Sequence, residues 1–442
     1  NPPLFQNEFL KQEGWPIMMK RIVTVLLVLC MMIGLVPALS ACSPSKYDSL
    51  PDSYNVETDY PYMLCSNSNH SLFITKTEKG YYFLAGDFLY YMDSGTMTPV
   101  IVCNKPECKH EKETDPEKVW QCNAFIGCES GNPFIQYYEG NIYCTSSINN
   151  IGTNNMDVSG EWLVQINKDG TERKTICAIE DKDAFLALHR GYIYIYILDV
   201  IEQRYHLYRK SLQYPEKEAE ELYTTPEDAL YSSIYLFGNH IFIQSDRMSK
   251  DETELYSYVD DYNLQTDNYT AVLNKDNIDE HTYIFGIYDQ KLLYKKIDIQ
   301  KKNMWDKGEE ILSYNLQNGS IETFMKLEQP KAPKYKRYLM SSGSKLLIYE
   351  QEMENYCPSA IYQLSNDGKE IIDELDDMSI YSKCYDYNFI VGDDNYAFEY
   401  YTMDGYTFEL DIVDKNKGLD IKNIFKENID VLKPEIAFYI EP

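Results

Sequence analysis

Three cysteines and one histidine in the first third of the chain have the residue types and spacing of a metal site. They follow the pattern C-x4-C-x-H-x11-C and are Cys103, Cys108, His110 and Cys122. Three thiolates and one imidazole can form a closed, tetrahedral zinc site. Residues 111–118 are charged and contain little apolar surface, so this stretch needs a cross-link to keep a defined shape. A structural zinc ion is therefore one prediction for the insert at residues 103–128.

Disulfide bonds are the alternative prediction for the same insert. A further cysteine, Cys128, follows Cys122 in C-x5-C spacing, and disulfides would be possible if the protein lies outside the cytoplasm. The C-x4-C pair also differs from the C-x2-C pair that is typical of zinc sites. Nine cysteines follow Cys42, so at least one is unpaired in any disulfide scheme. Both predictions stay open, as does a cluster that forms neither, and a closed site with four protein ligands would leave no coordination position for catalysis.

The sequence contains none of the common catalytic motifs. It has no G-x-S-x-G elbow, no P-loop and no dinucleotide-binding glycine pattern. His110-Glu111 is not followed by the second histidine of a zinc protease, and the six histidines are scattered along the chain. We therefore expect no catalytic residues and, apart from the possible zinc ion, no cofactor. A protein that is not an enzyme is the favoured interpretation.

The charge of the chain argues against one class of partner. The sequence has 41 basic and 70 acidic residues, which gives a net charge of -29. Because a nucleic-acid binder needs a basic surface to neutralise phosphates, this balance argues against DNA or RNA binding. An acidic surface instead helps to keep an exported protein soluble.

Residues 18–41 have the pattern of a bacterial export signal. The basic pair Lys20-Arg21 precedes an apolar stretch at residues 22–36, which is the order found in signal peptides. The stretch is short for a plain membrane anchor, which is the alternative. It ends in a motif that resembles the lipobox of bacterial lipoproteins, Leu39-Ser40-Ala41-Cys42. That resemblance implies cleavage before Cys42 and a diacylglyceryl group on its thiol, which would place the protein on the extracytoplasmic face of the cell membrane.

Four segments are expected from this pattern. Residues 1–17 carry no targeting signal and precede Met18, so we interpret them as an upstream extension that is not translated. The signal peptide at residues 18–41 is followed by a polar, flexible tether at residues 42–60. Residues 61–442 then form the folded domain, with the insert inside it.

A strand–turn–strand pattern repeats along the folded domain. A small or polar turn opens a tyrosine-rich apolar strand, and a second alternating strand ends in another polar turn. Consecutive turns lie 60, 51, 47, 51, 54 and 50 residues apart, at Gly80, Gly140, Gly191, Gly238, Asp289, Gly343 and Asp393. A period of about 50 residues made of strands predicts blades of four strands that stack in a ring. We predict an all-β propeller with seven blades; six or eight blades are the alternatives.

Closure of such a ring often uses one strand from each end of the domain. The candidates for these strands are residues 71–74 and residues 436–440. The pattern therefore predicts a shared blade that contains both ends of the chain.

The lipobox, the C-x4-C-x-H segment and the tyrosine-rich hairpins together resemble one group of proteins. They are similar to lipoproteins of clostridial Firmicutes whose propellers resemble TolB-like and low-density-lipoprotein-receptor-type domains. The resemblance covers nearly all of the mature chain. It implies a propeller fold and an envelope location, and it carries no catalytic residue over to this chain.

The leading functional prediction is a lipid-anchored propeller that binds a peptide, a glycan or an envelope protein at one face of the ring. Trp305 is a candidate aromatic contact within the candidate loops, which are residues 146–160, 246–253, 299–309 and 351–358. One alternative is a glycan lyase or hydrolase, which would need carboxylates grouped with a tyrosine or histidine near the channel. The other alternative is an envelope sensor or scaffold subunit.

Overall fold

The computed structural model divides the chain into two compact units, Asn1–Pro51 and Asp52–Pro442. The structure describes residues 46, 47, 49–64, 72–110, 122–127, 134–146, 161–181, 184–227, 229–248, 255–273, 281–297, 309–328, 334–342, 344–352, 358–376, 378, 381, 384, 386–390, 392–402 and 407–428. The second unit begins at Asp52, nine residues before the expected boundary at residue 61. Within the described part of the chain, no helix has the length and apolar character needed to cross a bilayer.

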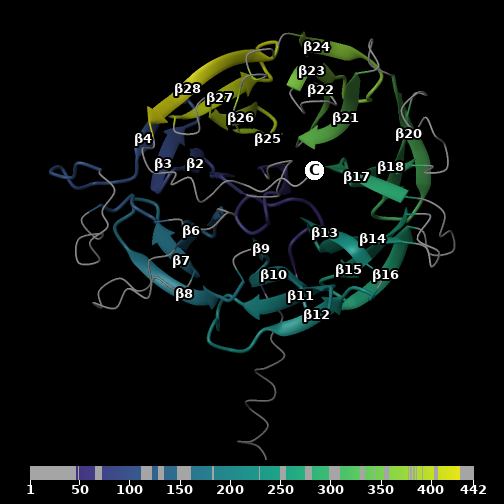
Figure 1. Ribbon diagram of the computed structural model, residues 1–442, viewed down its shortest axis with the longest axis horizontal. Helices are drawn as coiled ribbons and strands as arrows, with labels where there is room; N and C mark the ends of the chain where they lie inside the picture. Colours follow the sequence, from purple (N-terminus) through teal and green to yellow (C-terminus); the bar gives the residue numbers. More distant parts are fainter. Residues whose placement is uncertain are drawn as a thin grey trace, which may run out of the picture. The chain divides into compact units, whose positions relative to one another are not determined.

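The second unit is a seven-bladed β-propeller, and each blade is an antiparallel sheet of four strands (Figure 1). This confirms the predicted fold class and blade number. The first four blades contain β1 (Ile74–Lys76), β2 (Gly80–Ala85), β3 (Phe88–Asp93) and β4 (Pro99–Ile101); β5 (Ile135–Tyr138), β6 (Asn141–Ser146), β7 (Glu161–Asn167) and β8 (Arg173–Ile179); β9 (Phe185–His189), β10 (Tyr192–Asp199), β11 (Arg204–Ser211) and β12 (Glu220–Thr224); and β13 (Ala229–Phe237), β14 (His240–Met248), β15 (Leu255–Asn263) and β16 (Asn268–Leu273).

Blades 5 to 7 continue the same order. They contain β17 (His281–Tyr288), β18 (Lys291–Ile297), β19 (Glu309–Asn315) and β20 (Ile321–Leu327); β21 (Tyr335–Ser342), β22 (Lys345–Glu352), β23 (Pro358–Leu364) and β24 (Ile371–Leu375); and β25 (Asp386–Ile390), β26 (Tyr396–Thr402), β27 (Thr407–Asp414) and β28 (Asp420–Asn428). The first strand of each blade lies near the ring axis and the fourth lies at the rim (Figure 1).

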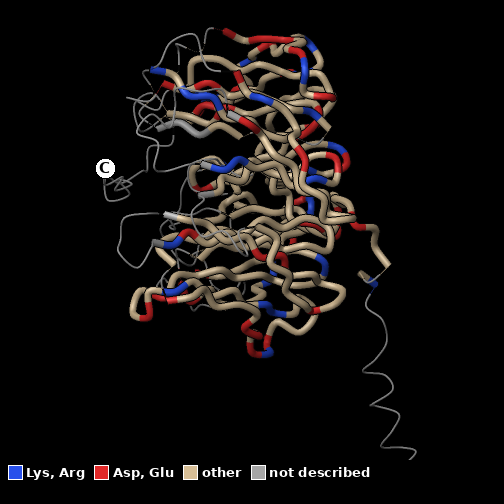
Figure 2. The backbone as a smooth tube through the Cα atoms, turned by 90° about the vertical axis from the view of Figure 1, so that its right-hand side faces the viewer, with Lys and Arg blue, Asp and Glu red and all other residues tan. Residues whose placement is uncertain are grey.

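Burial follows this arrangement. The second strand of blade 1, β2, is buried along its whole length, because both faces of a blade pack against neighbouring blades. The rim strands β16 and β20 are mostly exposed. Acidic and basic residues are interspersed over the described backbone (Figure 2).

The repeating turns join the first and second strands of the blades. The pairs Glu139-Gly140, Arg190-Gly191 and Asp289-Gln290 have positive φ at both residues. Two-residue turns of this type match the right-handed twist of the strands that they join. The regular turn spacing in the sequence therefore marks the same corner of successive blades.

Side chains close the ring between blade 7 and blade 1. The Phe425 ring lies 4.7 Å from the Tyr90 ring, and the Asp393 carboxylate accepts a hydrogen bond from Tyr81 (2.6 Å) and pairs with Lys76 (2.6 Å). Among the described residues every blade consists of four consecutive strands, so no shared blade is seen there. Of the two predicted closure strands, residues 72–74 lead into blade 1, whereas residues 436–440 lie outside the described residues.

Candidate functional site

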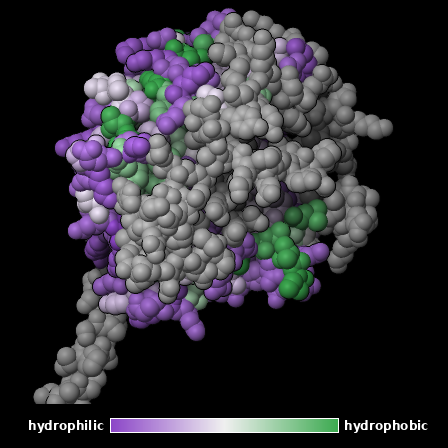
Figure 3. Space-filling view, turned by 60° about the vertical axis from the view of Figure 1, so that its left-hand side comes forward, coloured by the Kyte–Doolittle hydropathy of each residue, from purple (hydrophilic) through white to green (hydrophobic). Residues whose placement is uncertain are grey.

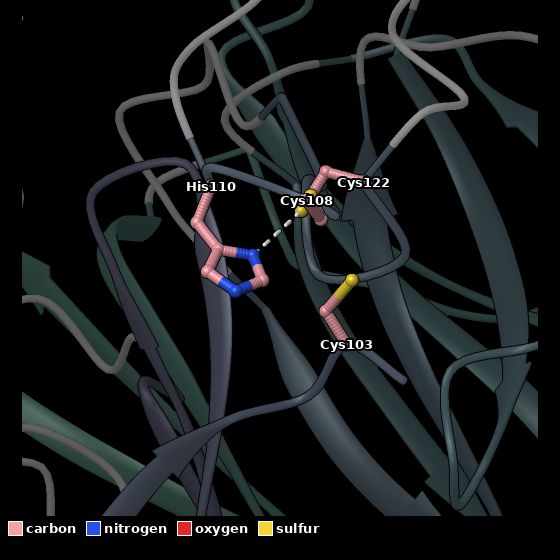
Figure 4. A group of neighbouring side chains, drawn as sticks. All are labelled: Cys103, Cys108, His110 and Cys122. Carbon is pink, nitrogen blue, oxygen red and sulfur yellow. Dashed lines mark hydrogen bonds between the residues drawn. The ribbon is translucent and has the colours of Figure 1, made fainter. Parts of the chain in front are cut away.

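The four predicted metal ligands lie together beside blade 1 (Figure 4). The Sγ atoms of Cys103, Cys108 and Cys122 and a ring nitrogen of His110 are all within 4.8 Å of one another. Cys122 Sγ is 3.6 Å from His110 Nδ1. Cys122 is buried and the other three are half-buried. All three cysteines are free thiols, and Cys128 lies outside the described residues.

Backbone pairing with blade 1 positions the cluster. Cys103 is the second residue after β4, and the N–H of Cys108 donates to the carbonyl of Lys105 (3.1 Å), which turns the chain back. The returning segment 122–127 pairs with the start of β3, where the N–H of Leu89 donates to the carbonyl of Ala124 (2.8 Å). The cluster therefore joins two segments that are separated by residues 111–121.

Arg173 of β8 connects this returning segment to blade 2. Its guanidinium donates hydrogen bonds to the carbonyl oxygens of Asn123 and Phe125, the residues that flank Ala124. Burial lowers the pKa of Arg173, while the nearby thiol groups act in the opposite direction. The guanidinium thus supplies positive charge close to the cysteines and fixes the backbone next to Cys122.

Electrostatics limits how many of the thiols can ionise without a cation. Burial raises the pKa of Cys122, and the neighbouring Cys103 and Cys108 raise it further. Burial also acts to raise the pKa of Cys103, but backbone N–H groups of Lys105 and Asn123 outweigh it, so the net shift is downward. A divalent cation would allow all three to bind as thiolates. Four protein ligands would close its tetrahedral shell, which suits a structural site and leaves no position for a substrate.

A second region with many buried polar contacts is the segment of residues 52–64, which includes the short helix η1 (Tyr62–Leu64). We call this segment the N-terminal lock. In the view down the ring it lies across the middle (Figure 1). It bonds to blades 2, 3, 4, 5 and 7 through Glu139 N–Glu57 O (2.8 Å), Arg190 N–Thr58 O (2.8 Å), Asn239 N–Asp52 Oδ1 (2.8 Å), Tyr62 Oη–Ile287 O (3.1 Å) and Gly392 N–Met63 O (2.9 Å).

Buried charge fastens the lock to blade 3. The Asp59 carboxylate pairs with the Arg190 guanidinium through Oδ1–Nε (3.0 Å) and Oδ2–Nη2 (3.2 Å), and their side chains are 0% and 3% exposed. His189 beside them accepts a hydrogen bond from the N–H of Tyr60 (3.0 Å), and its other ring nitrogen lies 2.7 Å from the carbonyl oxygen of Gly238. These groups therefore serve the structure of the ring.

His240 fastens the start of the lock to blade 4. Its Nε2 is 2.8 Å from Asp52 Oδ2, and its Nδ1 is 2.7 Å from Asp261 Oδ2. Burial alone would lower the pKa of His240, but the hydrogen bonds and charges of Asp261 and Asp52 outweigh it and raise the pKa to about 9. The imidazole is therefore protonated at neutral pH and bridges two carboxylates.

Blade 7 contains the grouping of carboxylates and tyrosines that an enzyme would require. The Tyr381 hydroxyl donates to Asp411 (2.7 Å) and the Tyr401 hydroxyl to Glu409 (3.3 Å). Both tyrosines are at most 3% exposed. Burial and the nearby carboxylates raise the pKa of each tyrosine far above neutrality, so the hydroxyls stay protonated. These contacts form a buried network inside a blade, where a polymer substrate cannot reach.

Several predicted sites lie outside the described residues. These are the lipobox residues Leu39, Ser40, Ala41 and Cys42, the aromatic candidate Trp305, and most of the four candidate loops. The loops join the second and third strands of blades 2, 4, 5 and 6. Because strands alternate in direction, the described ends of these loops share one side of the ring, which we call the far face. The lock binds at the opposite side, where first and second strands meet.

The lock is the functional element that sequence reasoning missed. Residues 52–60 were expected to belong to the flexible tether, yet Asp59 and Tyr60 are at most 2% exposed. The available signal was the group of tyrosines at positions 54, 60 and 62 beside acidic residues. Such a short group has no repeat pattern, so only its contacts reveal its role.

Comparison with known proteins establishes the fold alone. No family model matches the chain, and no curated protein matches it. A structure from a study of two prolyl endopeptidases is 9% identical with a TM-score of 0.50; the match covers 86% of this chain and 51% of that one. TolB from Acinetobacter baumannii is 14% identical, with a TM-score of 0.36 and coverage of 79% and 78%. The β-propeller domain of the Trilobed protease from Pyrococcus furiosus is 9% identical, with a TM-score of 0.43 and coverage of 79% and 95%. This chain therefore spans about half the length of the protein from the prolyl endopeptidase study. The similarity between the two is that of the β-propeller fold.

Proposed function

We propose that this protein is a lipid-anchored, extracytoplasmic propeller that binds a peptide, a glycan or another envelope component at its far face. The observation that supports this proposal most directly is the N-terminal lock. The chain leaves the propeller at Asp52, on the side where first and second strands meet. An anchor on the preceding segment would therefore pull on that side of the ring.

Chain length sets how far the propeller can stand from the membrane. Nine residues lie between the predicted acylated Cys42 and Asp52, and a fully extended chain covers at most about 3.5 Å per residue step, or about 35 Å in total. A tether of this length keeps the lock side toward the bilayer. The far face then points away from the membrane, toward partners in the envelope.

The proposal assigns the protein a binding role because its described buried polar groups already serve the fold. Asp59, Arg190 and His189 hold the lock in place. The carboxylates and tyrosines of blade 7 bond to each other below the surface. A zinc ion at Cys103, Cys108, His110 and Cys122 would add a structural cross-link next to blade 1, with no catalytic role.

Lipid attachment can be tested by metabolic labelling with a fatty acid that carries an alkyne. We expect the wild-type protein to be labelled and to sediment with membranes, whereas the Cys42→Ser variant is unlabelled. Equal labelling of the variant would refute acylation at Cys42.

The choice of face can be tested with a photo-crosslinking residue in the anchored protein. One variant carries it at Ile201, in the exposed turn between β10 and β11 at the far face, and the matched variant carries it at Asp169, in the exposed turn between β7 and β8 on the lock side. We expect envelope components to crosslink at position 201 and not at position 169. The reverse pattern would contradict the proposed orientation even if Cys42 is acylated.

A further inference from the structure

The hairpin between β10 and β11 gathers a second set of potential metal ligands at the far face. A carboxylate oxygen of Asp199, one of Glu202 and a ring nitrogen of His206 all lie within 4.8 Å of one another. Asp199 ends β10 and its Oδ1 accepts the N–H groups of Ile201 (2.8 Å) and Glu202 (2.9 Å). These bonds fix the turn and hold the Asp199 carboxylate in place near the histidine.

His206 directs one ring nitrogen into this group of carboxylates. Its side chain is 10% exposed. Nδ1 lies 2.9 Å from Glu221 Oε1 and 3.2 Å from Thr224 Oγ1. Nε2 is buried and has no hydrogen-bond partner within the described part of the chain, and the closest carboxylate oxygen, Glu202 Oε2, is 3.6 Å away. The Tyr208 ring stacks at 5.9 Å and helps to hold the imidazole.

This geometry fits a metal ligand better than a simple ion pair. A protonated Nε2 would need an acceptor, and 3.6 Å is too long for a hydrogen bond. A buried polar atom without a partner is unfavourable. If Nδ1–H donates to Glu221, Nε2 instead presents a lone pair to Asp199 and Glu202. Metal-bound histidines commonly have this arrangement, with the other ring nitrogen bonded to a carboxylate.

We propose that Asp199, Glu202 and His206 bind a divalent transition-metal ion such as Zn²⁺, with Glu221 as a positioning residue. One imidazole and two carboxylates suit zinc and related ions, whereas Ca²⁺ and Mg²⁺ prefer oxygen ligands alone. Three protein ligands leave coordination positions for water or for an oxygen atom of a bound partner. Glu202 is 57% exposed, so the ion is open to solvent.

The surroundings suit contact with a partner. Val200 and Ile201 lie between the two carboxylates in sequence and are 76% and 90% exposed. They add exposed apolar area next to the metal position. On the face drawn in Figure 3, the described surface is largely hydrophilic with separate apolar patches. The hairpin site therefore differs from the cysteine cluster, where four ligands close the coordination shell.

Calorimetric titration of the purified full-length chain with Zn²⁺ tests the proposal. We expect two classes of site, one at the cysteine cluster and a weaker one at the hairpin. Asp199→Asn keeps an oxygen for the turn, and His206→Asn keeps an N–H near Glu221, so both substitutions remove a ligand with little change of shape. Each should weaken the second class at least about tenfold and leave the first unchanged. Glu218→Gln, an equal loss of charge at an exposed position of blade 3, should change neither. A wild type in which no class of site is weakened by Asp199→Asn would overturn the proposal.

A spectroscopic measurement on the wild type avoids any effect of substitution on folding. The chain is first given one equivalent of Zn²⁺ to fill the thiolate cluster, and Co²⁺ is then added. We expect cobalt d–d bands without thiolate-to-cobalt charge transfer, because the hairpin offers only nitrogen and oxygen ligands. Charge-transfer bands, or no cobalt bands at all, would contradict the assignment.

The role of Glu221 is tested separately. Glu221→Gln should lower the affinity of the second class about 10- to 100-fold while the melting temperature of the metal-free protein stays unchanged. A change in melting temperature alone would indicate a structural role.

Discussion

The N-terminal lock and the cysteine cluster are both additions to the seven blades, and they bury polar groups in different ways. In the lock each buried charge has its counter-charge in the chain, as Asp59 has Arg190 and His240 has Asp52 and Asp261. The cluster gathers three thiols and an imidazole, and the nearby positive charge is that of Arg173. The lock is therefore complete as a protein structure, whereas the cluster requires a cation to ionise fully.

This difference predicts which experimental condition should change the stability of each region. The lock should respond to substitutions and pH that remove one member of a charge pair. The cluster should respond to metal concentration. Measurements that separate these two responses test the comparison.

The largest expected effect comes from the buried charge pair of the lock. Asp59→Asn removes the carboxylate that pairs with the 3%-exposed Arg190 side chain, and breaking a buried pair in this way lowers the free energy of unfolding by about 3–5 kcal/mol. Urea unfolding measures the change. The exposed control Glu172→Gln should stay within about 0.5 kcal/mol of the wild type. A loss below about 1 kcal/mol for Asp59→Asn would show that the lock does not depend on this pair.

Metal removal should have the next largest effect, at the cluster. Zn²⁺ at a hundred times its dissociation constant stabilises a protein by about 2.7 kcal/mol. We expect a chelator to lower the unfolding free energy of the wild type by at least this amount, and that of Cys122→Ser by clearly less, because the variant keeps only the weaker hairpin site. Cys177→Ser, the same substitution at a half-buried thiol of β8, should retain the response to the chelator. An identical chelator response in Cys122→Ser and the wild type would exclude zinc at the cluster.

The pH response of His240 distinguishes the lock from the cluster more finely. The neighbouring Asp261 and Asp52 raise its pKa to about 9, so its ion pairs stabilise the folded state fully below pH 6.5 and are lost as the pH rises through 9. Because Asp52 is 40% exposed, solvent screening reduces the effect to about 1–2 kcal/mol.

The readout is the difference in unfolding free energy between the wild type and His240→Gln at pH 7 and pH 10. This difference is needed because burial lowers the pKa of Lys415 to about 7. Lys415 therefore makes the free energy of unfolding rise with pH over the same range, in the wild type and in the variant alike. We expect the advantage of the wild type to shrink by pH 10. A constant difference would contradict a protonated His240 in the lock.

The smallest expected effect concerns one hydrogen bond of the lock. Tyr62→Phe removes the donor to the carbonyl of Ile287, and a single neutral hydrogen bond contributes about 0.5–1.5 kcal/mol. The denaturant midpoint should fall accordingly, while the chelator response stays as in the wild type. Tyr214→Phe, at a 45%-exposed position, is the control and should leave the midpoint unchanged. A midpoint equal to that control would mean that the bond adds nothing.

Particular residues show how far the sequence could be interpreted. Gly140, Gly191 and Asp289 could be recognised as turns because positive φ between strands restricts the residue types, and the structure confirms them. The cluster ligands could be named because thiols and an imidazole at short spacing are rare. Asp199, Glu202 and His206 also lie within eight residues, but they are common in exposed turns. Two features of the structure distinguish these three residues from ordinary turn residues. They are the contact of His206 with Glu221 on another strand and the orientation of His206 Nε2.

The sequence by itself determined the all-β class and the period, because local turn chemistry and alternating burial repeat along the chain; it favoured seven blades and left six or eight open. Tertiary structure alone decided how the ring is filled and closed. Asp59 finds Arg190 across 131 positions, and Tyr90 meets Phe425 at the junction of blades 1 and 7. Such contacts depend on side chains brought together only after the blades have stacked. No local pattern encodes them, because each partner in isolation is an ordinary surface residue of its own segment.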